Sequence, residues 1–243
     1  MTAAENMKAL QKSTTIDTIV DGAIYKLPEL DFFTPNIFSS IAFMDELIVK
    51  KPRKALLEDF RRLIKGWKSR GNVRPATSEE LDISALLDKF PEFRWGQHQY
   101  TEQAHFLMIH RLQYDRLKQA NAICLPKSRF VFVCRSRFWF FDQIIPVVIQ
   151  ERIDGIPLLE MVEKHSNAII PKWVKFLPKI NLRLRELLTS DLKNHINWFI
   201  RNFVYNPQDD ILWYIDSKPS CLFARIGNEQ NIQGLHDIFF KYD

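Results

Sequence analysis

The chain has 243 residues, of which 46% are hydrophobic, so it can bury a substantial core in one large domain or in two small lobes. It contains 19 Phe but only seven Gly, a composition that excludes glycine-rich turn architectures and low-complexity segments. The formal net charge of +5 is modest and spread along the chain, so it permits nucleic-acid binding without indicating it.

The first half of the chain predicts a tail, a hairpin and three helices. Residues 1–20 are polar and Thr-rich, so we expect a flexible N-terminal tail there. Two short apolar runs flank Asp45 and Glu46 and predict a hairpin that ends at Val49. Apolar residues at helical spacing then predict three helices, the second of which begins with the capping box of Thr77 and Glu80. These helices span residues 53 to about Gly66 or Gly71, 78–90 and 102–120.

The second half begins with strands and then changes to helix. Aromatic and β-branched segments predict a small antiparallel sheet. Its strands span residues 129–135, 138–141 and 146–151. The pattern is helical over 158–165 and from about 179 to 192, and it ends with a hairpin of strands 203–206 and 211–215. The change near residue 152 predicts a boundary between two lobes.

Several sequence features bear on the compartment, and they favour a cytoplasmic protein. Cys124, Cys134 and Cys221 lack the spacing of metal or redox sites, so we expect reduced thiols. No apolar stretch approaches the roughly 18 residues that span a bilayer, and the first residues are too polar for a signal peptide. We therefore expect no membrane partner. Delivery into another cell by a specialised export system stays open, since it leaves no mark in these patterns.

Three motifs after the predicted long helix resemble the protein-kinase superfamily, including its small atypical bacterial branches and effectors. His195-Ile196-Asn197 falls where that family has its H-x-D catalytic loop. Asn202 stands at the spacing of the metal-binding Asn, and Asp216-Ser217-Lys218 occupies the place of D-F-G. The resemblance covers residues 100–220 through such motifs and residues 20–100 by position only.

The resemblance implies ATP together with Mg²⁺ or Mn²⁺ as cofactors. Hard divalent ions prefer carboxylate and amide oxygens, which Asp216 and Asn202 supply, and in the family a hairpin brings two such residues to one ion. Each also has a structural alternative, Asp216 as a turn former and Asn202 as a loop cap. The segment VVIQERIDGIPL resembles the strand and hinge that hold adenine, which implies nucleotide contacts at Glu151 and Ile153.

The resemblance also implies a Lys and a Glu that position the phosphates. Lys50 or Lys51 is the candidate ammonium, with solvated surface as the alternative for both. Glu102 is the first choice for the partner, which makes residues 53–100 a helical insertion between the lysine strand and that helix. Glu58 is the second choice and needs no insertion, but it misplaces the helix.

Three departures from the family pattern bear on catalysis. Asn197 replaces the catalytic Asp, and an amide oxygen can orient a hydroxyl but cannot carry the charge that helps remove its proton. No GxGxxG motif occurs, so the phosphate cover is absent or is replaced near Thr34–Ser40. Only 27 residues follow Asp216, so we expect no peptide-docking subdomain after it. His195, in the catalytic-loop motif, is expected to anchor the loop, with a catalytic role as the alternative.

The sequence thus predicts an α+β protein with a two-lobed kinase-like fold, an N-terminal lobe over 21–151 and a truncated C-terminal lobe over 152–243. The first functional hypothesis is an atypical minimal kinase that transfers the γ-phosphate of ATP to a protein or small-molecule hydroxyl. The second is a pseudokinase that binds a protein partner, which Asn197 favours. A third discards the resemblance and makes the aromatic strands a nucleic-acid platform, although any sheet buried on one face shows the same pattern. Its basic residues are Arg129, Arg135 and Arg137.

Overall fold

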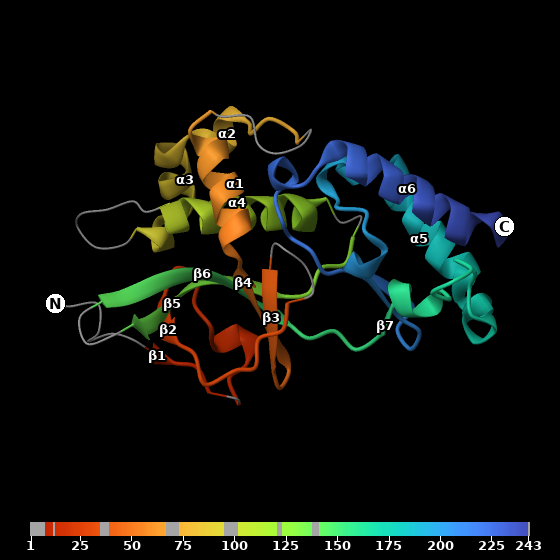
Figure 1. Ribbon diagram of the computed structural model, residues 1–243, viewed down its shortest axis with the longest axis horizontal. Helices are drawn as coiled ribbons and strands as arrows, with labels where there is room; N and C mark the ends of the chain where they lie inside the picture. The colour runs from red at the N-terminus through yellow and green to blue at the C-terminus, as the bar shows by residue number, and fades with distance from the viewer. Residues whose placement is uncertain are drawn as a thin grey trace. The chain divides into compact units, whose positions relative to one another are not determined.

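The protein is α+β, and its chain divides into two compact units (Figure 1). The structure is a computed structural model that describes residues 8–11, 13–34, 39–66, 73–94, 102–120, 123–137 and 141–242. Unit 1 comprises residues 1–69, 76–112 and 127–152, and unit 2 comprises residues 70–75, 113–126 and 153–243. The last change of unit lies between Arg152 and Ile153, next to the boundary expected from the sequence.

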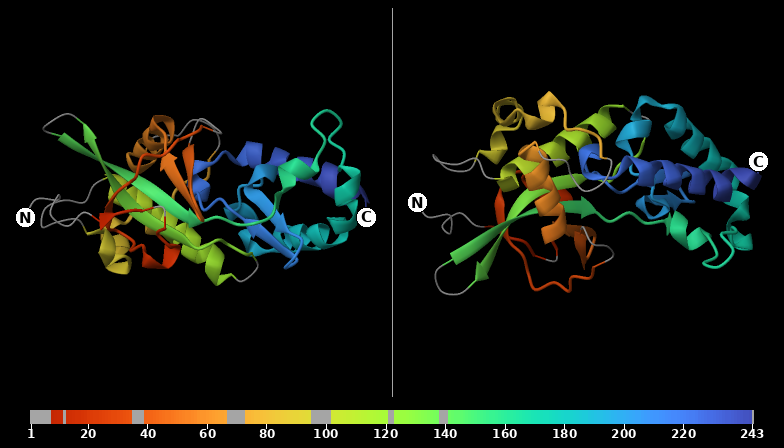
Figure 2. Two further views of the ribbon diagram at one scale, coloured as in Figure 1. Left: turned by 90° about the horizontal axis from the view of Figure 1, so that it is seen from below. Right: turned by 45° about the horizontal axis from the view of Figure 1, so that its top comes forward.

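Unit 1 is built on a six-stranded sheet in the order β1-β2-β5-β6-β4-β3. The strands β1, β2 and β5 are parallel to one another, whereas β3, β4, β5 and β6 are joined by antiparallel pairing. The strands β5 and β6 form the long green hairpin in Figure 2. The sheet is therefore mixed and larger than the small antiparallel sheet that we expected. The bounds are β1 Lys8–Ala9, β2 Ile24–Lys26, β3 Ser39–Met44, β4 Leu47–Pro52, β5 Ser128–Arg137 and β6 Phe141–Glu151.

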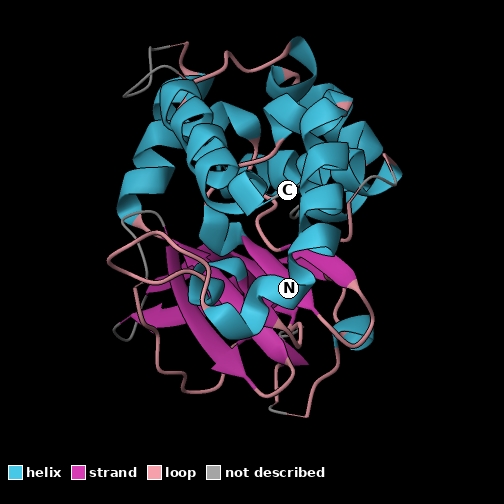
Figure 3. Ribbon diagram, turned by 90° about the vertical axis from the view of Figure 1, so that its right-hand side faces the viewer, coloured by secondary structure: helices cyan, strands magenta, loops and turns pink. Residues whose placement is uncertain are grey.

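Helices cover one side of this sheet, as Figures 1 and 3 show. Their aromatic side chains pack on it, and the ring of Phe93 meets that of Phe132 edge-on at 6.4 Å between centroids. Phe60 and Phe106 make a similar contact between two helices at 5.5 Å. The bounds are α1 Lys54–Ile64, α2 Ser78–Leu81, α3 Ile83–Lys89 and α4 Glu102–Gln119, with short 3-10 helices η2 Ile16–Thr18 and η3 Pro91–Phe93.

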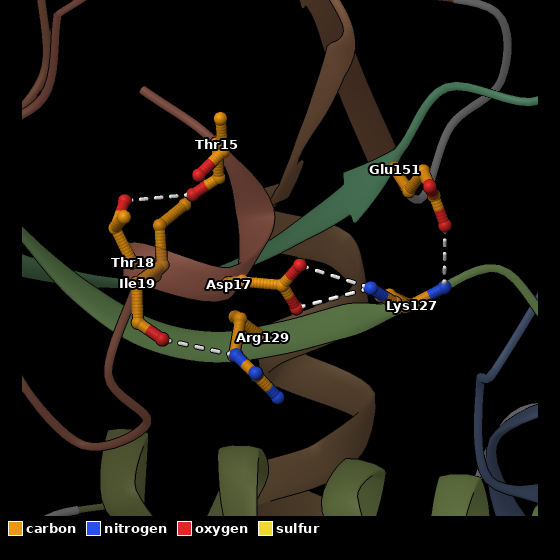
Figure 4. Close-up of polar contacts among 7 residues, drawn as sticks. All are labelled: Thr15, Asp17, Thr18, Ile19, Lys127, Arg129 and Glu151. Carbon is orange, nitrogen blue, oxygen red and sulfur yellow. Dashed lines mark hydrogen bonds and ion pairs between the residues drawn. The ribbon is translucent and has the colours of Figure 1, made fainter.

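The described part of the N-terminal segment is packed, in contrast to the flexible tail expected for residues 1–20. Leu10, Ile16 and Ile19 are buried in the cluster that covers the other side of the sheet. Polar contacts fix the same segment, because Arg129 Nε donates to the Ile19 carbonyl at 2.9 Å and Lys127 pairs with Asp17 (Figure 4). These three apolar residues do not continue a helical or a strand period along the segment. Their spacing therefore does not predict a packed element there.

The local predictions for unit 1 are mostly confirmed, with three differences at element boundaries. The capping box is present, since the Thr77 hydroxyl accepts from the Glu80 N–H while the Glu80 carboxylate accepts from the Thr77 N–H. The expected 78–90 helix is split, because Asp82 leaves the helical conformation and caps α3 by accepting from Ala85 N–H. The hairpin β3–β4 does not end at Val49 but continues to Pro52. Two long strands, β5 and β6, replace the three short segments expected, and residues 138–140 lie outside the described ranges.

Unit 2 contains a three-stranded antiparallel sheet in the order β7-β8-β9, together with helices α5 and α6. The hairpin predicted for residues 203–206 and 211–215 is confirmed, and its strands are β8 and β9. The helix expected over 158–165 is only a 3-10 turn, after which Val162 bridges Ile169 in antiparallel fashion. No helix in the described part of the chain is long and apolar enough to cross a membrane. The bounds are β7 Ile156–Pro157, β8 Phe203–Asn206, β9 Ile211–Tyr214, α5 Leu177–Thr189 and α6 Arg225–Phe239, with 3-10 helices η4 Leu158–Met161, η5 Pro171–Phe176, η6 Asp191–His195, η7 Ile200–Asn202, η8 Ser220–Leu222 and η9 Phe240–Tyr242.

Candidate functional site

The loop that follows η6 is held on both sides of Asn197 by one side chain of α6. Asn228 Oδ1 accepts from the Trp198 N–H at 2.8 Å, and Asn228 Nδ2 donates to the Ile196 carbonyl at 2.9 Å. Trp198 is fully buried, and its indole N–H donates to the Lys193 carbonyl at 2.9 Å. Because a buried amide satisfies two backbone groups at once, the position of Asn197 is fixed by the core of unit 2.

The hairpin β8–β9 brings the two predicted metal ligands to the same end of the sheet. Phe203 pairs with Tyr214, and the Ile215 N–H donates to the Asn202 carbonyl at 2.9 Å, one step beyond the ladder. Asn202 therefore lies just before β8 and Asp216 just after β9. Residues fourteen positions apart in the sequence are neighbours here because an antiparallel register places the start of one strand beside the end of the other.

Asn197, Asn202 and Asp216 form a hydrogen-bonded cluster. Asn197 Nδ2 donates to Asp216 Oδ2 at 3.1 Å, and Asn202 Nδ2 lies 3.4 Å from the same oxygen. Asn202 Nδ2 also donates to the Asn197 carbonyl at 2.9 Å, which closes the loop between these two residues. The other carboxylate oxygen, Asp216 Oδ1, accepts from the Lys218 N–H at 3.1 Å. Both oxygens of Asp216 are thus held by donors of unit 2.

A buried tyrosine hydroxyl completes the support of this cluster. The Tyr214 hydroxyl accepts from the Asn197 N–H at 2.9 Å, and the side chain is completely buried. Burial raises the pKa of Tyr214 well above its ordinary value, and the nearby negative charge of Asp216 raises it further. The phenol therefore stays neutral at physiological pH and serves the backbone of Asn197 as an acceptor.

The donor chemistry of the cluster fits a divalent ion that is shared with phosphate oxygens. One carboxylate and an amide oxygen suit Mg²⁺, which takes few protein ligands and completes its shell with water and phosphate. The Asn202 amide nitrogen is engaged by the Asn197 carbonyl and lies near Asp216, so the amide oxygen is the atom of this side chain that could bind a cation. Among the described residues no group of three or more His, Cys, Asp or Glu side chains could hold a metal ion.

His195 lies in a separate network at the start of the loop. Its carbonyl accepts from Gln113 Nε2 at 2.8 Å, and its Nδ1 lies 3.5 Å from the Ser220 hydroxyl. That hydroxyl in turn accepts from Arg74 Nε at 2.6 Å. These contacts connect the loop to other segments of unit 2 and suit an anchor better than a group that acts on a substrate.

The predicted Lys–Glu pair belongs to unit 1, where both glutamates have other partners. Glu102 pairs with Arg61 at 2.5 Å, and Glu58 pairs with Lys54 at 3.7 Å. The ammonium of Lys51 lies 4.2 Å from the centre of the Phe32 ring, on the side of the sheet that carries the N-terminal segment. Lys50 is opposite Val148 in the register, on the side that the helices cover. A pair with Lys50 stays a prediction.

The two predicted adenine contacts fall at the end of β6 and just beyond it. Glu151 is the last residue of β6, and its carboxylate accepts from the Lys127 N–H at 3.4 Å, as Figure 4 shows. Ile153 is half-buried and belongs to unit 2. Most of the predicted phosphate cover, residues 35–38, lies outside the described residues.

Neither comparison with known proteins found a relative of this chain. No family model matches. No curated protein matches the sequence. Conclusions about function therefore rest on the geometry of the cluster formed by Asn197, Asn202 and Asp216.

Two supporting residues of the cluster were missed in the sequence. Tyr214 is two positions before Asp216 on an extended strand, so the alternation of side chains could have placed both on one face. No sequence pattern indicates Asn228, because it lies in a helix that the apolar spacing does not predict and contacts a loop thirty residues away. Buried polar contacts between distant segments cannot be read from spacing.

Proposed function

We propose that unit 2 carries a phosphotransferase site of the protein-kinase kind, which uses ATP with Mg²⁺ or Mn²⁺. The observation that carries the proposal is the convergence of the Asn197 and Asn202 amides on Asp216, in a loop closed by the Asn202–Asn197 hydrogen bond. The H-x-N-x-x-x-x-N spacing and the hairpin exit at Asp216 support it, because in kinases the last Asn of the catalytic loop and the Asp of D-F-G hold the metal that bridges the ATP phosphates.

The three cluster residues would divide the work as follows. Asp216 and Asn202 hold the divalent ion, which neutralises phosphate charge when it is bound. Asn197 orients the acceptor hydroxyl through its amide oxygen, without the charge of a carboxylate. Phosphoryl transfer depends mostly on positioning and electrostatic stabilisation, so a site without a strong base can still turn over. Because Asn197 lacks the carboxylate, that turnover is slow. The acceptor is a protein or small-molecule hydroxyl.

A thermal shift experiment tests the proposed site, because a ligand that binds the folded state raises its stability by mass action. With Mg²⁺–ATP at a hundredfold excess over Kd, the midpoint should rise by about 5 to 10 °C for a protein of this size. The shift should need the metal and should vanish in Asp216→Ala. Asp209→Ala is a matched control, since Asp209 accepts from the Asn206 amide at 2.9 Å in the turn of the same hairpin. A wild-type protein without any Mg²⁺–ATP shift would remove the proposal.

A pseudokinase that binds a protein partner is the second candidate. It is favoured because the Asn197 amide nitrogen donates to Asp216, so the residue at the catalytic position is engaged within the site. Radiolabelled transfer from ATP to the protein itself or to a lysate separates the two candidates once binding is established. Transfer that is lost in Asp216→Ala supports the kinase, and binding without transfer supports the pseudokinase.

The nucleic-acid hypothesis gains no support from the described residues. Arg129 Nε donates to the Ile19 carbonyl within unit 1 and is thereby engaged. The side chains of Arg135 and Arg137 lie outside the described part of the chain. A salt-dependent mobility shift with single-stranded RNA or DNA stays the test, since phosphate contacts release counterions.

A further inference from the structure

The closed loop of the cluster presents two side chains outward. The hydrogen bond from Asn202 Nδ2 to the Asn197 carbonyl, 2.9 Å long, joins the ends of this short loop. Trp198 is fully buried, and Ile200 packs against the core of unit 2. Phe199 and Arg201 point the other way. Phe199 is 40% exposed, so an apolar ring is accessible next to the polar cluster.

Arg201 lies against the ring of Phe199. Its guanidinium carbon lies 4.7 Å from the centre of the Phe199 ring, close enough for a cation–π contact. The side chain forms no ion pair with any residue that the structure describes. Arg201 is exposed, and a stacked guanidinium loses little further freedom when it binds.

A second cation lies on the helix that supports the same loop. Arg225 is the first residue of α6 and is exposed. It precedes Asn228 by three positions, so the two occupy neighbouring places on the helix surface. Asn228 contacts the loop directly through Ile196 and Trp198. Within the described residues Arg225 also forms no ion pair, Glu229 of the same helix included.

We infer that Phe199, Arg201 and Arg225 form the surface that receives the acceptor, and that the acceptor is an acidic protein segment with its hydroxyl beside Asp or Glu side chains. The inference rests on the proposed function, which makes the bound segment the acceptor of the phosphate. Guanidinium groups bind carboxylates through paired, charge-assisted hydrogen bonds, and two unneutralised ones beside a site favour an anionic partner. The aromatic ring supplies the apolar contact that anchors a peptide.

A nucleic acid fits this surface less well than an acidic peptide. Base stacking needs free aromatic faces, whereas one face of the Phe199 ring is covered by Arg201. A nucleotide phosphate is the other anion that Arg201 could bind. The test therefore includes Mg²⁺–ATP and single-stranded RNA as separate probes.

The experiment measures binding of fluorescent peptides in which a central Ser is flanked by Glu, Ala or Lys. Fluorescence anisotropy is recorded at physiological ionic strength, where weak long-range attraction is screened. We expect the Glu-flanked peptide to bind best, and Arg201→Glu to weaken it about tenfold. Arg185→Glu is the matched control: it makes the same change of charge at another arginine stacked on a phenylalanine of unit 2, 4.8 Å from the Phe240 ring. The melting temperature of each variant checks that it is folded.

Several outcomes overturn the inference. Equal loss of peptide binding in Arg201→Glu and Arg185→Glu shows a general charge effect, and a preference for the Lys-flanked peptide contradicts the chemistry. Loss of the Mg²⁺–ATP shift in Arg201→Glu assigns Arg201 to the nucleotide, and RNA binding that depends on Arg201 assigns it to a nucleic acid. Acidic-peptide binding that depends on Arg201, in a protein without any Mg²⁺–ATP shift, refutes the proposed function and keeps the surface.

Discussion

Replacing Asn197 by Asp introduces the residue that kinases carry in the H-x-D motif, and the structure predicts the loss of stability that follows. In the wild type the Asn197 amide donates to Asp216 Oδ2 at 3.1 Å. An ionised Asp at this position has no proton to donate. Asn197→Asp therefore replaces an attractive contact by two carboxylates that face each other at a nearly buried position, since residue 197 is only 4% exposed.

The size of the effect follows from two contributions. Losing a hydrogen bond to a charged group destabilises by about 1.5 kcal/mol or somewhat more. Two like charges about 4 Å apart repel by roughly 4 kcal/mol at an effective dielectric constant of 20, which we halve because Asp216 is partly exposed. At neutral pH the free energy of unfolding should therefore fall by about 3 to 4 kcal/mol. Asn197→Ala, which removes the bond without adding charge, should cost about 1 to 2 kcal/mol.

The two variants should also differ in their response to metal and acid. A divalent ion between the carboxylates cancels their repulsion, so Mg²⁺ or Mn²⁺ should restore much of the stability of Asn197→Asp and little of that of Asn197→Ala. Lowering the pH protonates one of the two carboxyl groups, so the deficit of Asn197→Asp should shrink as the pH falls.

Urea unfolding with and without metal, at neutral pH and at about pH 5, measures these differences. If Asn197→Asp is no less stable than Asn197→Ala, or if metal stabilises both equally, residue 197 does not face Asp216 as the structure has it. In the kinase interpretation, phosphate transfer per bound ATP should also be faster in Asn197→Asp.

Two further pairs of variants test the support of the site and the fold. Tyr214→Phe leaves the buried Asn197 N–H without an acceptor, which should cost about 1 to 3 kcal/mol in urea unfolding and weaken Mg²⁺–ATP binding; Tyr205→Phe, at the far end of the same hairpin, should change stability only. Equal nucleotide affinity in both variants would argue against a role of Tyr214 in the site. Gly22→Ala should destabilise by at least about 3 kcal/mol in thermal unfolding, because φ is +72° and an added Cβ would lie 2.0 Å from a backbone oxygen. Gly66 has a similar φ with open space around it, so Gly66→Ala should cost only about 1 kcal/mol, and equal losses would contradict the packing at Gly22.

The sequence predicted best what depends on contacts close along the chain. The capping box of Thr77 and Glu80 needs only a spacing of three residues, and it is present. The hairpin of β8 and β9 follows from two apolar runs around a turn, and its register brings Asn202 beside Asp216. The proximity of these two residues could be predicted because a hairpin fixes its register locally.

The missed features depend on contacts between distant segments. The strand β2 pairs in parallel with β5, so that Ile24 lies opposite Phe132, more than a hundred residues away. Such pairing has no signature in either segment alone, so the sequence does not predict β2. The contact of Asn228 with the loop, and that of Glu102 with Arg61, are likewise set by helix packing.

The central claim is that Asn202 and Asp216 share one divalent ion with ATP, and paramagnetic NMR tests it most directly. In a protein labelled with ¹⁵N, the side-chain amide signals of Asn197 and Asn202 are assigned by substitution, and Mn²⁺–ATP is then added. The account predicts that both signals broaden selectively in the wild type and keep their width in Asp216→Asn. Signals that stay sharp while Mn²⁺–ATP binds would show that the ion lies elsewhere, and would contradict the account.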